Sequence, residues 1–415
     1  MNRFFGSTGY LLVVGVLVGV ALVAAWVVIG TYGFVRLGNQ SLRNTVDELG
    51  PSWSADGTRV AFAADEDGSY DIFVQSVDGD DRTNITNSAE ESSHPVWSPD
   101  GSWIAYISKG SRGYDIYVVR PDGSGRSNLT NFPSLYTDIA WSPDGTKIAF
   151  VSNRDVLQLE LLQNPQQGAL PRPERRSPDI YVIDINGRDT ARLTFDLASD
   201  RRPQWSPDGG KLIFQSTRDG NSEIYTINAD GSGLARLTDN DVTDVDPMWS
   251  PDGTRIAFAT ARPQTEFQEH LEENQSVQPF ANIGRSNLRA LATGLNFDIY
   301  MMNTDGSRAI NLTNSPNTDD TRPVWSPDGS FVAFDGAYLR VPPTAPGKSE
   351  VYVLQVDGAD GVIPITQPTT PPETHEAPAW SPDGRHIGYV SRDVDSVRVR
   401  TVEVRSEEPG PRGSS

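Results

Sequence analysis

The apolar and polar positions along the chain follow two different patterns. No charged residue occurs between Arg3 and Arg36, and residues 10–35 form an almost continuous apolar run. After that run, apolar residues come in short stretches that are rich in β-branched and aromatic side chains and are separated by Pro, Asp and Gly. Such stretches are typical of strands and turns rather than of helices. The sequence therefore predicts one long apolar segment followed by an all-β region.

The apolar run is long enough to cross a membrane, because a bilayer core needs about 20 apolar residues in a helix. We expect a short tail at 1–9, followed by a transmembrane signal-anchor helix at 10–35. The alternative is a signal peptide cleaved after Val23-Ala24-Ala25, although typical signal peptides have shorter apolar regions. The arginines on the two sides do not separate the two orientations. We expect the all-β region to lie on the extracytoplasmic side of the membrane.

One repeat organises the all-β region. The motif Trp-Ser-x-Asp-Gly occurs seven times at spacings of 44, 44, 64, 44, 76 and 55 residues, and a period near 44 is typical of four-stranded propeller blades. Each copy continues with an apolar run, an acidic-apolar-aromatic triplet (altered in the seventh copy), a turn and, except in the seventh, a Leu/Ile-Thr pair. The Pro-Asp-Gly part suits a hairpin turn between the first two strands. We assign a structural role in the repeat to Trp53, Trp97, Trp141, Trp205, Trp249, Trp325 and Trp380.

The seventh copy lacks its last strand, and the missing strand has a candidate at the other end of the region. Residues 40–46 precede the first Trp at nearly the spacing that separates a Leu/Ile-Thr pair from the next Trp. Pairing this segment with the last blade would remove two open sheet edges. We therefore predict an all-β fold, a seven-bladed β-propeller of four-stranded antiparallel blades over 40–405, preceded by one N-terminal transmembrane helix. Residues 406–415 are expected to be a disordered tail.

The recurring PxWSPDGxxIAF…DIY…DG…LT pattern resembles the WD40-like propeller repeats of the TolB family. The resemblance covers about residues 40–405 and implies a propeller that binds proteins or peptides on one face, usually outside the cytoplasm. The TolB pattern has six blades and a separate N-terminal α/β domain, whereas this chain has seven copies of the motif directly after the apolar run. A specific role in the cell envelope therefore does not carry over from the resemblance.

Insertions in the repeat point to one face of the predicted propeller. The longest lie near 156–175 and 262–294, between the second and third strands of their copies. In an up-and-down blade these loops emerge on the same face as the connections between blades, and insertions gathered on one face often mark a binding face. We expect a protein or peptide partner there; the alternative is that the insertions cap the propeller or only fill loops. Membrane contact is expected through 10–35. The formal net charge of −20 argues against a nucleic-acid partner.

Residues just before each Trp should line the mouth of the axial channel on the same face. Mixed charge at such a mouth suits a peptide terminus, a sugar or a cation. The alternative is that these residues are merely solvated loop positions. The candidates are His94, Asp138, Arg202, Asp246 and Arg322, three positions before a Trp, and Glu376, four before.

The sequence favours a non-catalytic binding scaffold. It has no Cys and four His, with no HExxH, GxSxG, phosphate-loop or dinucleotide-binding motif, so we assign no catalytic residue, cofactor or metal ligand. One alternative is a propeller-type hydrolase, a lyase or a cation-dependent enzyme at the channel mouth, with Ca²⁺ held by an acidic cluster that includes Asp246. Another is a cell-wall glycan binder, which exposed aromatic residues such as Phe195, Phe267 or Tyr136 on the loop face would favour.

Overall fold

The computed structural model describes the propeller region with several gaps. The predicted anchor at 10–35, the closing segment at 40–46 and the tail at 406–415 lie outside the described residues. No helix within the described part of the chain is long and apolar enough to cross a membrane. The described ranges are 50–65, 69–77, 81–110, 113–132, 134–154, 177–263, 295–315, 318–338, 349–357, 361–366, 373–392 and 397–404.

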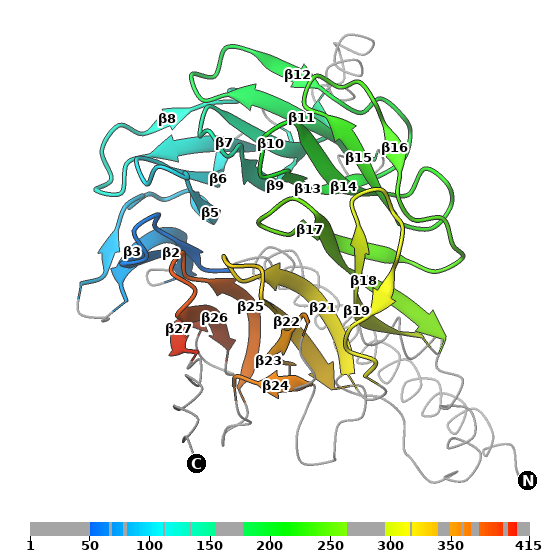
Figure 1. Ribbon diagram of the computed structural model, residues 1–415. Helices are drawn as coiled ribbons and strands as arrows, with labels where there is room; N and C mark the ends of the chain where they lie inside the picture. Colours follow the sequence, from blue (N-terminus) through cyan, green and yellow to red (C-terminus); the bar gives the residue numbers. More distant parts are fainter. Residues whose placement is uncertain are drawn as a thin grey trace, which may run out of the picture. The chain divides into compact units, whose positions relative to one another are not determined.

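The strands form seven antiparallel sheets in which chain neighbours pair in order (Figure 1). The first blade is β1 (Ser52–Trp53), β2 (Arg59–Asp65), β3 (Tyr70–Ser76) and β4 (Thr83–Asn84). The second is β5 (Glu91–Trp97), β6 (Ile104–Gly110), β7 (Gly113–Val119) and β8 (Ser127–Asn128). The third is β9 (Tyr136–Trp141), β10 (Lys147–Ser152), β11 (Asp179–Asp184) and β12 (Thr190–Arg192), and the fourth is β13 (Asp200–Trp205), β14 (Lys211–Ser216), β15 (Glu223–Asn228) and β16 (Ala235–Arg236).

The last three blades follow the same plan. They are β17 (Asp244–Trp249), β18 (Arg255–Pro263), β19 (Leu295–Asn303) and β20 (Ile310–Asn311); β21 (Thr318–Trp325), β22 (Phe331–Tyr338), β23 (Ser349–Gln355) and β24 (Val362–Pro364); and β25 (Thr374–Trp380), β26 (His386–Arg392) and β27 (Val397–Glu403). Six sheets have four strands, and the seventh has three within the described residues. The predicted seven-bladed propeller of four-stranded antiparallel blades is confirmed.

Each inner strand ends in the Trp motif because the residues after the Trp form a self-contained hairpin turn. In the second blade, Asp100 Oδ1 accepts hydrogen bonds from Ser98 Oγ at 2.6 Å and from Ser102 N at 3.0 Å. Gly101 adopts a φ of +72°, which glycine tolerates without steric cost. The repeated Asp therefore serves turn chemistry, as predicted. The turns between first and second strands, and between third and fourth strands, form what we call the turn face.

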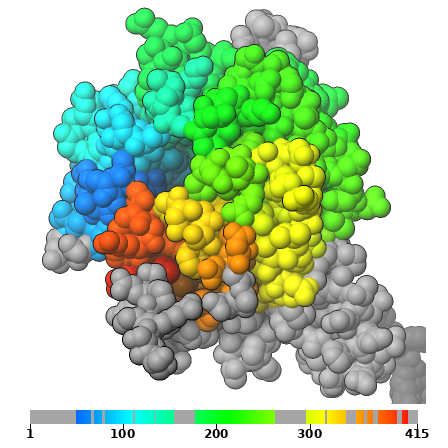
Figure 2. All heavy atoms as spheres, in the orientation of Figure 1, coloured from blue at the N-terminus to red at the C-terminus, as the bar shows by residue number. Residues whose placement is uncertain are grey.

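At five blade boundaries, the repeated Trp donates a hydrogen bond to the preceding blade. Trp141 Nε1 donates to the Val96 carbonyl of the preceding blade at 2.9 Å. Trp53 Nε1 donates to the Ala379 carbonyl at 2.9 Å, so the first and last blades are joined in the same way and the ring is closed (Figures 1 and 2). A Cβ added at Gly388 would lie 3.1 Å from Pro51 and 3.2 Å from Trp53 Nε1, which explains a small residue at this close approach. The Trp residues with this donation are Trp53, Trp141, Trp205, Trp325 and Trp380.

Second strands are apolar on both sides because a neighbouring blade covers each side. In β6, Ile104, Ala105 and Tyr106 are fully buried, and burying a large apolar side chain of this kind contributes about 1.5–3 kcal/mol. The core cluster that includes Ile116 and Phe150 spans the second and third blades. The hydrophobic core is therefore a series of layers between blades, which holds the inner strands around a common axis.

The acid of each repeated triplet fastens the third strand to the fourth. In the second blade, Thr130 Oγ1 donates to Asp115 Oδ1 at 2.7 Å and accepts from Ile116 N at 3.0 Å. Asn128 Nδ2 donates to the other oxygen of Asp115 at 3.1 Å. This network recurs with local changes in other blades, so the triplet acid and the Leu/Ile-Thr pair have a structural role.

Candidate functional site

A bulge interrupts the inner strand of six blades three residues before the Trp. The pairing register between first and second strands shifts there, as between Arg201 and Gln204. The residue at this position adopts a positive φ, although non-glycine residues rarely do so. Pro commonly follows it, and Pro suits a bulge because it donates no hydrogen bond to the ladder. The bulge residues are His94, Asp138, Arg202, Asp246, Arg322 and Ala377, with φ between +53° and +56°.

Three of the predicted site residues form one ion-pair chain across three blades. Arg202 Nε of the fourth blade lies 3.2 Å from Asp246 Oδ1 of the fifth and 3.7 Å from Asp138 Oδ1 of the third. The Arg202 side chain remains 35% exposed, whereas Asp138 is nearly buried. The bulges therefore bring the charged groups of neighbouring blades together, and they leave the arginine accessible.

A second chain joins the sixth and seventh blades. Arg322 Nε lies 2.9 Å from Asp335 Oδ2, and Arg322 Nη2 lies 3.5 Å from Glu376 Oε2. Glu376 also accepts from Arg392 Nη2 at 2.8 Å. Asp335 Oδ1 accepts from Ala377 N at 2.8 Å. The buried Asp335 carboxylate is thus shared between an arginine and the bulge backbone.

The two chains act on one another across the axis. The charges of Arg202 and Asp246 both reach Arg322, which lies two blades from Arg202. Burial raises the pKa of Asp335 to about 7, against the lowering effect of Arg322, and Glu376 and Asp246 raise it further. We call these residues the charged ring: Asp138, Arg202, Asp246, Arg322, Asp335, Glu376 and Arg392.

The structure places the six predicted site residues as follows. Asp138, Arg202 and Asp246 are in contact, and so are Arg322 and Glu376. His94 has the same bulge conformation in the second blade, and its Nδ1 lies 2.8 Å from Ser93 Oγ. Ion pairs therefore join five of the six predicted residues, and their binding role stays a prediction.

Sequence reasoning missed Asp335 and Gln215, which share one place in the repeat. Each lies ten residues after a Trp, in an otherwise apolar second strand, and accepts a hydrogen bond from the bulge backbone of the next blade. Gln215 Oε1 accepts from Asp246 N at 2.9 Å. A polar residue that breaks the apolar pattern of a buried strand was the signal that could have revealed both.

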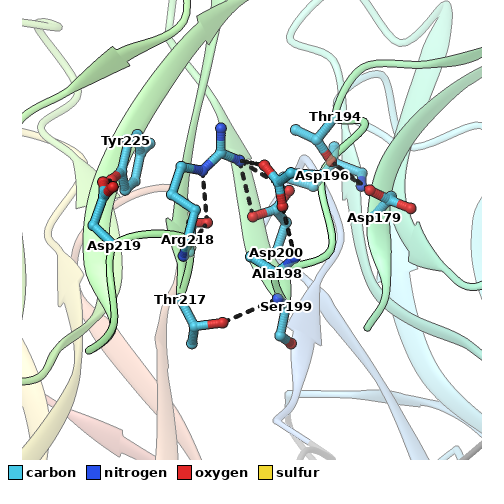
Figure 3. Close-up of polar contacts among 12 residues, drawn as sticks. Asp179, Thr194, Asp196, Ala198, Ser199, Asp200, Thr217, Arg218, Asp219 and Tyr225 are labelled. Atoms are coloured by element: carbon cyan, nitrogen blue, oxygen red, sulfur yellow. Dashed lines mark hydrogen bonds and ion pairs between the residues drawn. The ribbon is translucent and has the colours of Figure 1, made fainter. Parts of the chain in front are cut away.

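A layer of buried acids lies between blades near the same face, at the starts of inner and third strands. At the boundary of the third and fourth blades, Arg218 Nη2 lies 2.9 Å from Asp196 and 3.1 Å from Asp200 (Figure 3). Burial raises the pKa of Asp179 to about 7, although Arg192 beside it acts in the opposite direction. Asp200 is also buried, and its negative charge raises the pKa of Asp179 further.

The next boundaries repeat this arrangement with different partners. Burial raises the pKa of Asp244 to about 7, with the nearby Glu223 adding to the effect. Burial also raises the pKa values of Asp319 and Asp320 to about 6. Between the sixth and seventh blades, His375 Nδ1 lies 2.7 Å from Glu350 Oε2. Among the described residues, this face therefore holds buried ionisable groups that the turn face does not repeat.

The insertions emerge where they were predicted. The segments 155–176, 264–294 and 339–348 connect second to third strands and lie outside the described residues, as does Phe267. We call the face with these loops and the connections between blades the insertion face. Phe195 and Leu197, in one such connection, are 71% and 97% exposed. Tyr136 is only 2% exposed because it packs in the core with Phe150, so it does not favour the glycan-binding alternative.

Within the described part of the chain, no group of three or more His, Cys, Asp or Glu residues is placed to hold a metal ion. The charged ring neutralises its carboxylates with arginines instead. In this ring, arginine donors alternate with carboxylate acceptors.

Comparisons with known proteins agree with this architecture. A protein-family model described as the TolB beta propeller domain matches residues 39–158 and 166–288, more than half of the chain. No curated protein matches the sequence.

Solved structures show the same fold at low identity. The putative TolB from Agrobacterium tumefaciens is 22% identical, with 75% of this chain and 90% of that chain covered and a TM-score of 0.45. The oligogalacturonate lyase from Vibrio parahaemolyticus is 14% identical over 86% of this chain and 89% of that one, with a TM-score of 0.60. A puromycin-hydrolyzing peptidase of Mycobacterium tuberculosis is 14% identical over 86% and 52%, also with a TM-score of 0.60. On the family match, the chain belongs to the TolB β-propeller domain family.

Proposed function

We propose that this propeller is a non-catalytic scaffold that binds a protein or peptide partner on its insertion face. The observation that carries the proposal is the charged ring. Ion pairs across blades hold Arg202 and Arg322, yet their side chains stay 35% and 28% exposed. Arginine is enriched among the residues that dominate protein interfaces. TolB-like propellers generally interact with proteins, which supports the same assignment.

The strained backbone of the ring supports a binding role. A left-handed conformation in a non-glycine residue is costly and persists where the surrounding structure enforces it, often at functional sites. Here it turns the side chains of Asp138, Arg202 and Asp246 toward one another. A segment that presents both charges can exchange ion pairs with such a ring without leaving a buried charge unpaired.

Apolar side chains on the same face complement the ring. Phe195 and Leu197 project from the connection between the third and fourth blades and are mostly exposed. Arg192 Cζ lies 5.0 Å from the centre of the Phe195 ring, which holds the aromatic group beside the blade edge. An interface generally combines apolar anchors with a polar rim. Phe195 and Leu197 are the anchors that we assign to this face.

The scaffold is proposed to be membrane-anchored through residues 10–35, with the propeller on the extracytoplasmic side. The apolar run in the sequence supports this part of the proposal. Protease added to intact cells should digest the propeller. Protection of the propeller until the cells are lysed would contradict the orientation.

The binding face is tested by in-cell cross-linking and mass spectrometry on the full-length chain. Phe195→Ser with Leu197→Ser should lower the yield of the cross-linked partner at least tenfold, because the anchors are lost. Both side chains are exposed, so the thermal unfolding midpoint should hardly change. The matched control is Leu234→Ser, which alters a 47% exposed leucine next to a turn between third and fourth strands.

Replacing 264–294 by a short Gly-Ser linker should reduce the same cross-links. If the yield were unchanged in both insertion-face variants but fell in Leu234→Ser, the partner would bind the turn face and the proposal would be wrong.

A further inference from the structure

The turn face has two cavities at neighbouring blade boundaries, and they occupy the same place in the repeat. The one between the third and fourth blades has a volume of about 360 Å³, and the one between the fourth and fifth has about 470 Å³. Sites for small ligands commonly measure about 300–1,000 Å³. The lining side chains are Trp205, Lys147, Asp144 and Asp208 in the first, and Trp249, Lys211, Asp208 and Asp252 in the second.

Other boundaries show which group fits beside the Trp. The residue six positions after each Trp faces the Trp of the next blade. Arg59 Cζ lies 5.2 Å from the centre of the Trp97 ring, and Arg255 Cζ lies 5.3 Å from that of Trp325. At the boundary of the sixth and seventh blades, Phe331 occupies this position, with its ring centre 6.3 Å from that of Trp380. Planar groups therefore cover the Trp at these boundaries.

The two cavities occur where this position is a lysine. Lys147 and Lys211 stand six residues after Trp141 and Trp205, and each lines its cavity. A lysine ends in a compact ammonium group, whereas the arginine guanidinium is planar and stacks on aromatic faces. Beside these lysines, Trp205 and Trp249 are 9% and 8% exposed, against 5% for Trp97 and Trp325 beneath the arginines.

The charge of the cavities suits a cation. Each is lined by two aspartates and one lysine, which gives a net negative charge. Where the chain supplies its own guanidinium, Arg255 Nη1 donates to Asp357 Oδ1 at 3.3 Å. The counterparts of Asp357 are Asp230 and Asp305, which directly follow the cavity-lining residues Ala229 and Thr304.

We infer that these two cavities bind the guanidinium groups of arginine side chains in a basic segment of a partner protein. The Trp ring supplies the stacking face, and the aspartates supply carboxylates that accept paired hydrogen bonds from a guanidinium. Two equivalent sites on adjacent blades favour a segment with more than one arginine. The net charge of −20 attracts such a segment. This site lies on the opposite face from the proposed partner site and is independent of it.

The inference is tested with a fluorescein-labelled peptide of alternating arginine and glycine, titrated with the full-length protein and followed by fluorescence anisotropy. A lysine-glycine peptide of equal length and charge is the comparison probe. The arginine peptide should bind at least tenfold more tightly, because a guanidinium group stacks on Trp and donates two parallel hydrogen bonds to a carboxylate, whereas an ammonium group does neither. Equal affinity for both peptides would mean attraction by net charge alone and would overturn the inference.

Filling the cavities from within the chain provides the sharper experiment. Lys147→Arg with Lys211→Arg keeps the net charge and places a guanidinium where Arg59 and Arg255 have theirs. The double variant should bind the arginine peptide at least tenfold more weakly, with an unchanged thermal unfolding midpoint.

The matched control is Lys109→Arg, which makes the same chemical change near the insertion face, where Lys109 pairs with Glu91 at 3.0 Å. The Lys109→Arg variant should bind the arginine peptide with the same affinity as the unmodified protein. Unchanged affinity in the double variant would show that the peptide binds elsewhere.

Discussion

The two faces of the propeller use the same residue type, aspartate, in opposite ways. On the turn face, each turn Asp accepts hydrogen bonds within its own motif and remains largely solvated. Near the insertion face, carboxyl groups are buried between blades and pair with arginines or with one another. The sequence of the repeat is therefore uniform where an isolated turn suffices, and it varies where neighbouring blades pack against one another.

The pKa values express this difference. The hydrogen bond from Ser54 and that from Thr58 N lower the pKa of Asp56 to about 2. The corresponding serine is the main cause of a lowered pKa at other turns, and at Asp328 the same kind of hydrogen bonds prevail over burial, which acts in the opposite direction. Burial instead raises the pKa of Asp244 to about 7. The turns with a serine as the main cause are those of Asp56, Asp100, Asp144, Asp208, Asp252 and Asp383.

The largest effect is expected from Arg322→Met at the insertion face. This change removes the cation 2.9 Å from Asp335 and leaves a buried carboxylate with Ala377 N as its remaining hydrogen-bond donor. Breaking one side of a buried ion pair costs about 3–5 kcal/mol. Urea unfolding at pH 8 should show a loss of this order. At pH 5 the loss should shrink, because Asp335 then takes up a proton.

A second substitution separates the charge from the packing. Asn at position 335 keeps an oxygen for Ala377 N but carries no charge. The double variant Arg322→Met with Asp335→Asn should recover most of the lost stability at pH 8. If both variants were equally unstable, the cost would come from the missing side chain rather than from the unpaired carboxylate.

The sequence predicted what every blade repeats and missed what single blades change. The Trp motif and its spacing were sufficient for the blade count, the Asp-Gly turns and the place of the insertions. The ring candidates followed from their constant distance to the Trp, and Arg202 indeed contacts Asp138 and Asp246. Asp335 was missed because the backbone group that it accepts from, Ala377 N, belongs to the next blade. Contacts of this kind depend on how blades pack, and a repeat pattern does not encode them.

The stability against unfolding should be highest in mildly acidic solution, because the aspartates near the two faces change it with pH in opposite directions. Asp179, Asp244 and Asp335 have native pKa values of about 7, above the unfolded value of about 3.9. The native state therefore binds more protons between these values, so stability falls as the pH rises from about 4 through 7. The turn Asp groups have the opposite sign, and their contribution is lost as the pH falls below about 4.

Thermal unfolding between pH 3 and 9 should thus give the highest midpoint at about pH 4. Asp335→Asn should lessen the fall of the midpoint at higher pH and leave its fall at low pH unchanged. Asp56→Asn should lessen the fall at low pH and leave the fall at higher pH unchanged. A midpoint that rises steadily up to pH 8 would show that the buried acids are ionised at little cost, against their raised pKa values.

The smallest effect on stability is expected from Arg202→Gln, and this makes the variant the best probe of binding. Arg202 is 35% exposed, the nearly buried Asp138 lies 3.7 Å away, beyond hydrogen-bond distance, and Asp246 at 3.2 Å is itself partly exposed. We therefore expect a contribution close to that of exposed pairs, about 0–1 kcal/mol. Urea unfolding should therefore change by less than about 1 kcal/mol, while cross-linking to the proposed partner decreases. Arg255→Gln, which removes a 25% exposed arginine from the turn face, should leave that cross-linking unchanged. A loss of more than about 2 kcal/mol in Arg202→Gln would instead make the ring a structural element, like the turns opposite, and would remove the main support for a binding face.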